Sequence, residues 1–250
     1  MKIKSILISQ PQPSDLEKSP YADLAKKFNI TISYRKFITI EGITAKEFRK
    51  DRVNIRDYTA VIFTSRNAVD HFFRISKEMR VEVPDTMKYF SISESTAYYL
   101  QKYVQYRKRK VFHSKEHFAN LVELIKKHKT EKFLLPCSDI HKQEISNMLE
   151  ENKISYKKAV IYRTLASDLS GLRIEDYDLL VFFSPSGIKS LFKNFPKFKQ
   201  NNKLIGAFGP STAKAATDAG LKISIMAPSK TAPSMTMAIE EYLLKELKKK

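Results

Sequence analysis

Cysteine, acidic residues and long apolar segments are all scarce in this sequence of 250 residues. The single cysteine, Cys137, excludes an internal disulfide and follows an apolar strand, so we expect a packed thiol in a reducing, cytoplasmic environment. No apolar run approaches the length of a membrane span, so we expect no membrane association. We also expect no signal peptide, because the first residues lead from a short strand directly into Gln10–Pro13.

The shortage of acidic residues leaves a strongly basic chain. Asp and Glu number 27 against 45 Lys and Arg, which gives a formal net charge of +18. Such a surface attracts nucleic acid, acidic lipid, or a small polycarboxylate or polyphosphate. The lysines are spread along the chain, and the runs Arg107–Lys110 and Lys248–Lys250 are most simply solvated ends of helices or strands. The charge therefore indicates the sign of a partner and not its identity.

One segment, Leu179–Phe192, combines an apolar strand, a polar turn and the start of a helix. Its continuous apolar run, Leu179–Phe183, predicts a strand that is covered on both faces. In the polar turn, Ser184 or Ser186 is expected to cap the helix, and Gly187 to allow close approach to the backbone. In an open α/β sheet this kind of turn lies at the carboxyl edge, where its amides and hydroxyls favour an anion.

The same pattern occurs twice in the sequence. Tyr58–Phe73 (YTAVIFTSRNAVDHFF) matches Tyr177–Phe192 (YDLLVFFSPSGIKSLF), which begins 119 residues later. Further matches follow in the same order: Ile32–Lys36 with Ile154–Lys158, Phe90–Ala97 with Gly206–Ala213, and His113–Lys115 with Pro228–Lys230. General likeness among α/β units is the alternative, but a duplicated unit and two similar domains explain the order better.

Strands alternate with helices throughout, which predicts an α/β fold with mostly parallel sheets. Two long extended stretches, Ile30–Ile40 and Ile154–Thr164, occupy equivalent places in the repeat. If the chain crosses between domains at each stretch, one domain combines the N-terminal strands with the C-terminal third. We therefore predict domain 1 from residues 1–33 and 168–250, domain 2 from residues 39–162, and linkers at about 34–38 and 163–167.

This organisation resembles the uroporphyrinogen-III synthase family over the whole chain. The segments that carry the resemblance are Val61–Val69, Val160–Thr164, Phe182–Gly187, Gly209–Ala213, and Pro228–Met235 followed by a helix. The sequence departs from the family pattern after the first strand, within Ser91–Glu94, and in the loop after Leu135.

The resemblance implies two flavodoxin-like domains joined by a two-stranded linker, with the active site in the cleft between them. The implied activity is that of a lyase of porphyrin, tetrapyrrole and haem biosynthesis. It cyclises hydroxymethylbilane, a linear tetrapyrrole with acetate and propionate arms, by dehydration and inversion of the last pyrrole through a spiro intermediate. No cofactor or metal is implied, and we expect a monomer. Because the unassisted substrate closes without inversion, catalysis would consist largely of positioning.

On this interpretation Tyr162, at the end of the second extended stretch, assists departure of the hydroxyl group. The turns of both halves would bind the carboxylates. The predicted substrate-binding residues are Thr64, Ser65, Arg66, Asn67, Thr96, Ser184, Ser186, Gly187, Gly209, Pro210, Ser211, Thr212 and Thr231. Lys203 is a weaker candidate. His113 and His117 are four residues apart, but no acidic or cysteine ligand accompanies them at a fixed spacing, so no metal site is expected.

Two other classes of function remain open from the residues alone. A non-catalytic two-domain protein that binds a small anion would have the same cleft but would form no product from hydroxymethylbilane. A nucleic-acid-binding protein would explain the charge of +18, but we find no matching motif and no basic patch interleaved with aromatic residues.

Overall fold

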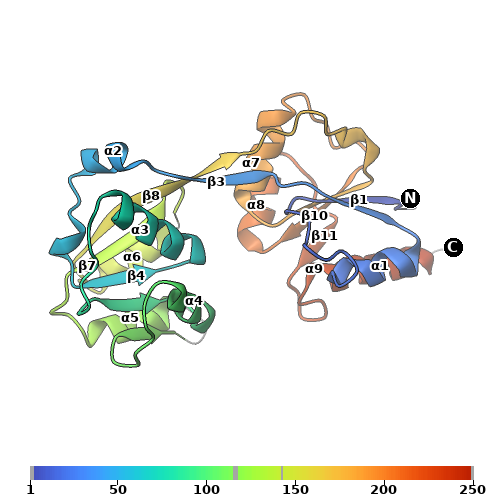
Figure 1. Cartoon of the computed structure of the whole chain (residues 1–250). Coiled ribbons are helices and arrows are strands. Elements are labelled where there is room, and N and C mark those ends of the chain that lie inside the picture. Colours follow the sequence, from blue (N-terminus) through green and yellow to red (C-terminus); the bar gives the residue numbers. More distant parts are fainter. Residues whose placement is uncertain (1–2, 115–117, 142, 249–250) are drawn as a thin grey trace. The chain divides into compact units, whose positions relative to one another are not determined.

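The structure, a computed structural model, describes residues 3–114, 118–141 and 143–248. The chain forms two compact units (Figure 1). Unit 1 is assembled from Met1–Thr39 and Leu165–Lys250, and unit 2 is the continuous segment Ile40–Thr164. No helix in the described part of the chain is both long enough and apolar enough to cross a membrane.

Unit 1 contains a parallel sheet with the strand order β11-β10-β9-β1-β2. Read from β2, this is the flavodoxin-like order, in which the chain adds strands first on one side of the starting strand and then on the other. The strands are β1 (Ser5–Ile8), β2 (Thr31–Tyr34), β9 (Leu179–Phe182), β10 (Leu204–Phe208) and β11 (Ile225–Ala227). The helices are α1 (Pro20–Phe28), α7 (Pro185–Asn194), α8 (Pro210–Asp218) and α9 (Met235–Leu247).

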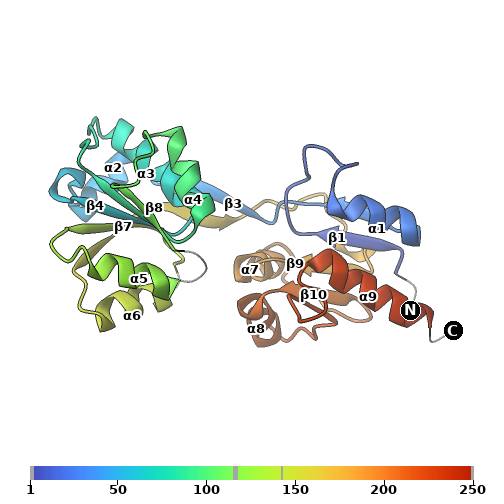
Figure 2. The same ribbon diagram turned by 90° about the horizontal axis from the view of Figure 1, so that it is seen from below.

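Both faces of the unit 1 sheet are covered by helices, with α1 and α9 in contact on one face and α7 and α8 on the other (Figure 2). Leu179 and Val181 of β9 face the core under α1 and α9, whereas Leu180 and Phe182 face the core under α7 and α8. All four side chains are at most 1% exposed. Burial on both faces explains why this strand is apolar at every position rather than at alternate ones.

Unit 2 has the sheet order β3-β8-β7-β4-β5-β6, and the part that begins at β8 repeats the order of unit 1. The strands are β3 (Ile38–Gly42), β4 (Ala60–Phe63), β5 (Lys88–Ser91), β6 (Val111–His113), β7 (Phe133–Ser138) and β8 (Tyr156–Ala166). The helices are α2 (Ala45–Phe48), α3 (Arg66–Glu78), α4 (Glu94–Tyr99), α5 (Phe118–Lys126) and α6 (Gln143–Glu151). The predicted α/β fold with mostly parallel sheets is confirmed.

The extended stretch predicted over Ile30–Ile40 contains two strands, β2 and the start of β3. β2 pairs with β1 in unit 1, and β3 pairs with β8. Phe37 separates them: it is fully buried, packs edge-on against Phe182 at 5.5 Å, and thereby fixes the chain to the core of unit 1 between the two strands.

α4 is a short helix that follows β5. α4 ends at Tyr99, and a single 3₁₀ turn, Leu100–Lys102, follows it. Ser93 caps α4, since its hydroxyl oxygen accepts a hydrogen bond from the Thr96 amide at 3.3 Å.

Candidate active site

A cavity of about 180 Å³ lies at the carboxyl ends of the central strands of unit 2. The chain leaves β4 toward β5 on one side and leaves β7 toward β8 on the other, so the strand order reverses between β4 and β7. Ligands of open α/β sheets bind in the crevice at such a point. The residues that line the cavity are Thr64, Ser65, Ile92, Leu135, Cys137, Ser138, Ile140, His141, Ile145 and Tyr162.

The cavity brings together three of the predicted site residues, Thr64, Ser65 and Tyr162. The Ser65 hydroxyl oxygen caps α3 by accepting a hydrogen bond from the Ala68 amide at 3.1 Å, and it lies 3.3 Å from the Tyr162 hydroxyl. The register of β8 against β7 shifts by one residue just before Tyr162: Cys137 pairs with Val160, and the next residue, Ser138, pairs with Tyr162. Bulges of this kind change the direction of a side chain next to a site.

The Tyr162 ring is buried, with 7% exposed, and packs against the imidazole of His71 on α3. The two rings are stacked at 5.1 Å, and Nδ1 of His71 accepts a hydrogen bond from Nε of Arg74 at 3.1 Å. Burial raises the pKa of Tyr162. The phenol therefore keeps its proton at neutral pH, and this proton can be donated in a hydrogen bond.

Cys137 lines the same cavity but is unsuited to be a nucleophile. The thiol is free and buried, and burial raises its pKa to about 11. It is therefore protonated at neutral pH, as expected for a packed thiol.

The other residues predicted for this half of the site are placed less directly at the cavity. Arg66 and Asn67 are exposed in the first turn of α3, and the Arg66 guanidinium lies over the Tyr99 ring at 5.4 Å. Thr96 is buried, and the Ser93 hydroxyl is 3.3 Å from its amide and 3.1 Å from its hydroxyl. The substrate-binding roles of these three residues stay predictions.

Unit 1 has an equivalent turn after β9. The Ser184 hydroxyl oxygen accepts a hydrogen bond from the Gly187 amide at 3.2 Å, as Ser65 does for Ala68 in unit 2. Ser184 is therefore the cap of α7, and Ser186 lies within the first helical turn. Because the Gly187 amide is already bonded to Ser184, it is less available to a ligand than the sequence suggests.

The turn after β10 differs in having free amides. Gly209 has a φ of 85°, and no side chain caps α8. Pro210 has no amide hydrogen, which leaves the amides of Ser211 and Thr212 at the helix N-terminus without a side-chain acceptor among the described residues. Ser211 is exposed, whereas Thr212 is 1% exposed, so the Ser211 amide is the more accessible of the two.

Thr231 lies in the exposed loop between β11 and α9. Its hydroxyl donates to Glu241 at 3.3 Å and lies 3.4 Å from the Ser229 hydroxyl. As the strands of unit 1 are parallel, the turns after β9, β10 and β11 belong to one edge of its sheet.

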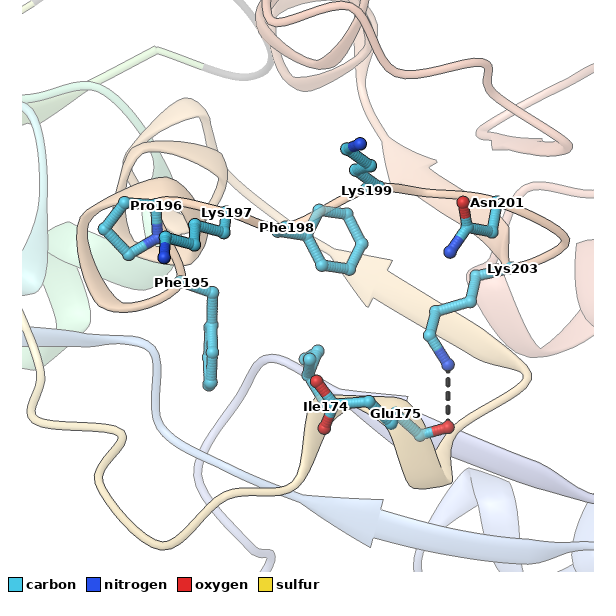
Figure 3. Close-up of a pocket in the computed structure, with 9 residues that line it drawn as sticks. All are labelled: Ile174, Glu175, Phe195, Pro196, Lys197, Phe198, Lys199, Asn201 and Lys203. Carbon is cyan, nitrogen blue, oxygen red and sulfur yellow. Dashed lines mark hydrogen bonds between the residues drawn. The ribbon is translucent and has the colours of Figure 1, made fainter.

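A second cavity, of about 510 Å³, lies at the opposite edge of the unit 1 sheet (Figure 3). Lys203, which precedes β10, lines it and donates to the backbone carbonyl oxygens of Glu175 at 2.8 Å and Tyr177 at 2.7 Å. Both carbonyls belong to the segment before β9, so Lys203 stabilises the amino edge of the sheet and is remote from the predicted turns.

The sequence analysis did not identify His141, Ser138 or the isoleucines that line the unit 2 cavity. The only sequence signal of Ser138 and His141 is their place shortly after the apolar run that ends at Leu135, where the sequence departs from the family pattern. No three His, Cys, Asp or Glu side chains within residues 3–114, 118–141 and 143–248 are arranged to hold a metal ion. His117 lies outside the described residues.

Solved structures with the same architecture include uroporphyrinogen-III synthetase from Helicobacter pylori. It has a TM-score of 0.64 and 18% identity, and the match covers 97% of this chain and 100% of that chain. A mutant uroporphyrinogen III synthase from Thermus thermophilus has a TM-score of 0.57 and 15% identity, over 99% of this chain and 100% of that chain. At these identities the likeness defines the fold, a two-unit α/β protein of the synthase type.

The sequence comparisons define the family. The family model described as uroporphyrinogen-III synthase HemD matches residues 22–237, so the chain belongs to the uroporphyrinogen-III synthase family. A protein of Methanocaldococcus jannaschii named "Putative uroporphyrinogen-III synthase" is 28% identical over 195 residues, which are 74% of this chain and 79% of that protein. The predicted family, and with it the predicted class of enzyme, a cyclising lyase, is confirmed.

Proposed function

We propose that this chain is a uroporphyrinogen-III synthase that cyclises hydroxymethylbilane with inversion of the last pyrrole ring, in tetrapyrrole and haem biosynthesis. The observation that carries the proposal is the unit 2 cavity, where the Tyr162 phenol lies 3.3 Å from the Ser65 hydroxyl at the point of strand reversal. Family membership supplies the reaction, and the cavity supplies a protonated donor for it.

In this proposal Tyr162 is the catalytic residue. A hydroxyl group leaves poorly as hydroxide, and a hydrogen bond from the phenol would lower the barrier to dehydration. The Ser65 hydroxyl, fixed by its bond to the Ala68 amide, would orient the phenol. Thr64, at the same cavity wall, would contact the substrate.

The carboxylate arms of the substrate would be bound by polar turns and by the basic surface. Unit 1 would contribute Ser184, Ser186, Gly187 and Thr231 together with the free amides that follow Gly209 and Pro210, at Ser211 and Thr212. Unit 2 would contribute Arg66, Asn67 and Thr96. A net charge of +18 favours capture of a polycarboxylate.

We further propose that the two units are folding domains with the bounds 1–33 plus 168–250 and 39–162, and linkers at about 34–38 and 163–167. We expect a monomeric, cytoplasmic enzyme that needs no metal or cofactor and binds neither nucleic acid nor membrane.

The test is turnover by the purified chain, with hydroxymethylbilane generated in situ and the isomers separated after oxidation. We expect mainly the type III isomer, and the same result after treatment with a chelator. Formation of the type I isomer alone, at the uncatalysed rate, would contradict the proposal and favour a non-catalytic protein that binds a small anion.

A further inference from the structure

Arg74, in the second half of α3, is the centre of a hydrogen-bond network in unit 2. Nε of Arg74 donates to Nδ1 of His71 at 3.1 Å, and Nη1 donates to Glu78 at 2.5 Å. Nη2 donates to two backbone carbonyl oxygens, those of Ile43 at 2.8 Å and Ile161 at 3.1 Å. All three nitrogen atoms of the guanidinium therefore form hydrogen bonds, and they connect α3 with the strands beside it.

One of these bonds acts directly on the backbone of Tyr162. The Ile161 carbonyl and the Tyr162 amide belong to the same planar peptide unit, so a donor fixed on that carbonyl restrains the plane from which the tyrosine side chain extends. The Ile43 amide, just after β3, donates to the same carbonyl at 3.1 Å. Without Arg74 this peptide unit would stay bonded to the neighbouring segment but would lose its connection to α3.

The second connection runs through the ring of His71, which is stacked on the Tyr162 phenol at 5.1 Å, with 21° between the planes. A guanidinium group only donates hydrogen bonds, so Nδ1 of His71 is the acceptor and the neutral ring carries its proton on Nε2. Burial and the charge of Arg74 lower the pKa of His71, against the opposing effect of Asp70 and Glu78, so the ring is mostly neutral at pH 7. Arg74 thereby fixes the tautomer and the tilt of the ring that packs against Tyr162.

The Ser65 hydroxyl alone does not determine where the phenol lies. Its oxygen is 3.3 Å from the Tyr162 hydroxyl, whereas a strong bond between two hydroxyl groups is about 2.7–2.8 Å long. A contact of this length is weak, so the position of the phenol depends on the groups that hold its ring face and its backbone. Both of these groups are bonded to Arg74.

Gly42, the last residue of β3, leaves the space that Arg74 occupies. An added Cβ on this residue would lie 2.7 Å from both Cζ and Nε of the guanidinium. Glycine weakens a strand, and it often marks a place where another group passes close to the backbone. Here the group is the Arg74 side chain, which any larger residue at position 42 would displace.

We propose that Arg74 is a positioning residue for Tyr162, which directs the phenol to the unit 2 cavity by holding its peptide plane and the imidazole stacked on its ring. Arg74 does not line this cavity, so it acts through Tyr162 rather than by contact with the substrate. The effect on turnover rests on the proposed function, but the position of the ring can be measured without turnover.

Kinetics in two backgrounds distinguish positioning of Tyr162 from a general structural role. We expect Arg74→Met to lower kcat about tenfold with KM changed little, because misplacing a reacting group by about 1 Å costs up to about 100-fold. In the Tyr162→Phe background the same substitution should have no further effect, since the donor that Arg74 positions is already absent. A merely structural role would lower kcat by the same factor in both backgrounds.

Two further variants provide the same test if Arg74→Met does not fold. Arg74→Lys keeps the positive charge but lacks the planar group that reaches His71 and both carbonyls together. Gly42→Ala leaves the guanidinium in the chain but displaces it from the side of β3. Each should lower kcat in the wild-type background and leave it unchanged in the Tyr162→Phe background.

Arg163→Met is the matched control. Arg163 follows Tyr162 directly on β8, but its guanidinium is paired with Glu47 on α2 and not with the groups that Arg74 contacts. This ion pair is partly exposed, so its loss should leave kcat within about twofold of the wild-type value.

The position of the ring is measured by fluorine NMR of the full-length chain in which Tyr162 alone is replaced by 3-fluorotyrosine, since shielding by a stacked imidazole depends on the geometry of the stack. The signal should move in Arg74→Met and His71→Ala and stay in place in Arg163→Met. An unmoved signal in Arg74→Met, or a loss of kcat that is as large in the Tyr162→Phe background, would overturn the proposal. A moved signal without any type III isomer from the wild-type chain would preserve the positioning role and contradict the proposed function instead.

Discussion

At the scale of single residues, the site depends on a few groups whose protonation and contacts are set by burial. Burial raises the pKa of the Tyr162 phenol above its ordinary value, and Ser65 and His71 orient the ring. Within the resemblance to the synthase family, the sequence analysis predicted Ser65 from the polar turn after an apolar strand and Tyr162 from its place at the end of the second extended stretch. It could not predict their hydrogen bond, which joins residues 97 positions apart in the sequence.

Tyr162→Phe removes the proton that is proposed to assist departure of the hydroxyl group. We expect kcat to fall about 100-fold, the lower range for loss of general acid catalysis, with KM changed little. The 3.3 Å bond to Ser65 is long, so stability should be nearly unchanged, which thermal unfolding can verify. An unchanged kcat would remove Tyr162 from the mechanism.

Gly209→Ala tests the backbone of the turn before α8. With φ at 85° and ψ at 151°, this residue occupies a region that is essentially restricted to glycine. No atom lies within 4 Å of the position of an added Cβ, so the cost comes from the backbone alone. We expect a loss of about 1–3 kcal/mol in the free energy of unfolding, measured by urea denaturation.

Gly187→Ala is the matched control for that substitution. Gly187 has no positive φ and lies within α7, and its added Cβ would contact the Phe182 ring at 3.4 Å and the Ser184 hydroxyl at 3.7 Å. Alanine is the better helix former, so the stability of this variant should be equal or higher. If the two variants were equally stable, the argument from the Gly209 backbone would be wrong.

At the scale of helices and strands, the edges of the unit 1 sheet are fixed by polar residues just outside the strands. The Asp178 carboxylate, which precedes β9, accepts hydrogen bonds from the amides of Lys4 (2.7 Å) and Ser5 (3.0 Å) and from the Ser5 hydroxyl (3.1 Å). Burial works to raise the pKa of Asp178, but these hydrogen bonds outweigh it and lower the pKa.

The lowered pKa of Asp178 has a consequence for the pH dependence of stability. Because the folded-state pKa lies below the unfolded one, the stabilisation is complete above the unfolded pKa of about 4 and is lost as the pH falls through the folded pKa. Asp178→Asn should therefore cost about 1–2 kcal/mol at pH 7, and its difference from the wild type should shrink below about pH 4. Urea denaturation at a series of pH values measures this difference.

Asp176→Asn is the control for Asp178→Asn. The Asp176 side chain is about half exposed, and its ion pair at 3.2 Å is with Arg173, whose side chain is 80% exposed. This substitution should change stability by less than about 0.5 kcal/mol at any pH. A cost for Asp178→Asn that is the same at pH 7 and pH 3 would contradict the role of the Asp178 charge.

The positions of most strands could be predicted because strands that are buried on both faces are apolar at every residue, as in Leu179–Phe182. The division of Ile30–Ile40 into β2 and β3 could not. Both strands and the residues between them favour extended backbone, and only the burial of Phe37 against Phe182 decides where one strand ends.

At the scale of the whole molecule, the sequence repeat and the structural unit are different objects. The first repeat contains β1 and β2 followed by β4, β5 and β6, and the second contains β7 and β8 followed by β9, β10 and β11. Each sheet takes its first two flavodoxin-like strands from one repeat and its last three from the other. The matching segments Tyr58–Phe73 and Tyr177–Phe192 consequently provide the same strand, turn and helix at the same place in the two sheets.

Two strands, β3 and β8, carry the chain across the division between the units. The Ser167 amide donates to the Phe37 carbonyl at 2.9 Å, and the Ile43 amide donates to the Ile161 carbonyl at 3.1 Å. Residue numbers therefore rise along one strand as they fall along the other, and the pair is antiparallel. In this register Thr39 is opposite Leu165, at the bounds of unit 1.

This topology predicts that each unit folds without the other. The segment Ile40–Thr164 contains β4 to β7, β8 as far as Thr164, α2 to α6 and buried clusters on both faces of its sheet. Unit 1 needs both of its segments. Because Thr39 is opposite Leu165, a two-residue Asn-Gly hairpin turn should join these two residues in place of unit 2.

We expect the isolated segment Ile40–Thr164 and the joined unit 1 each to unfold cooperatively in urea and to give dispersed amide resonances. Residues 1–39 alone, with β1 and β2 but no neighbouring strand β9, should remain unfolded. If the segment Ile40–Thr164 showed no cooperative transition, the units would depend on each other for folding, and the bounds proposed for the two domains would be contradicted.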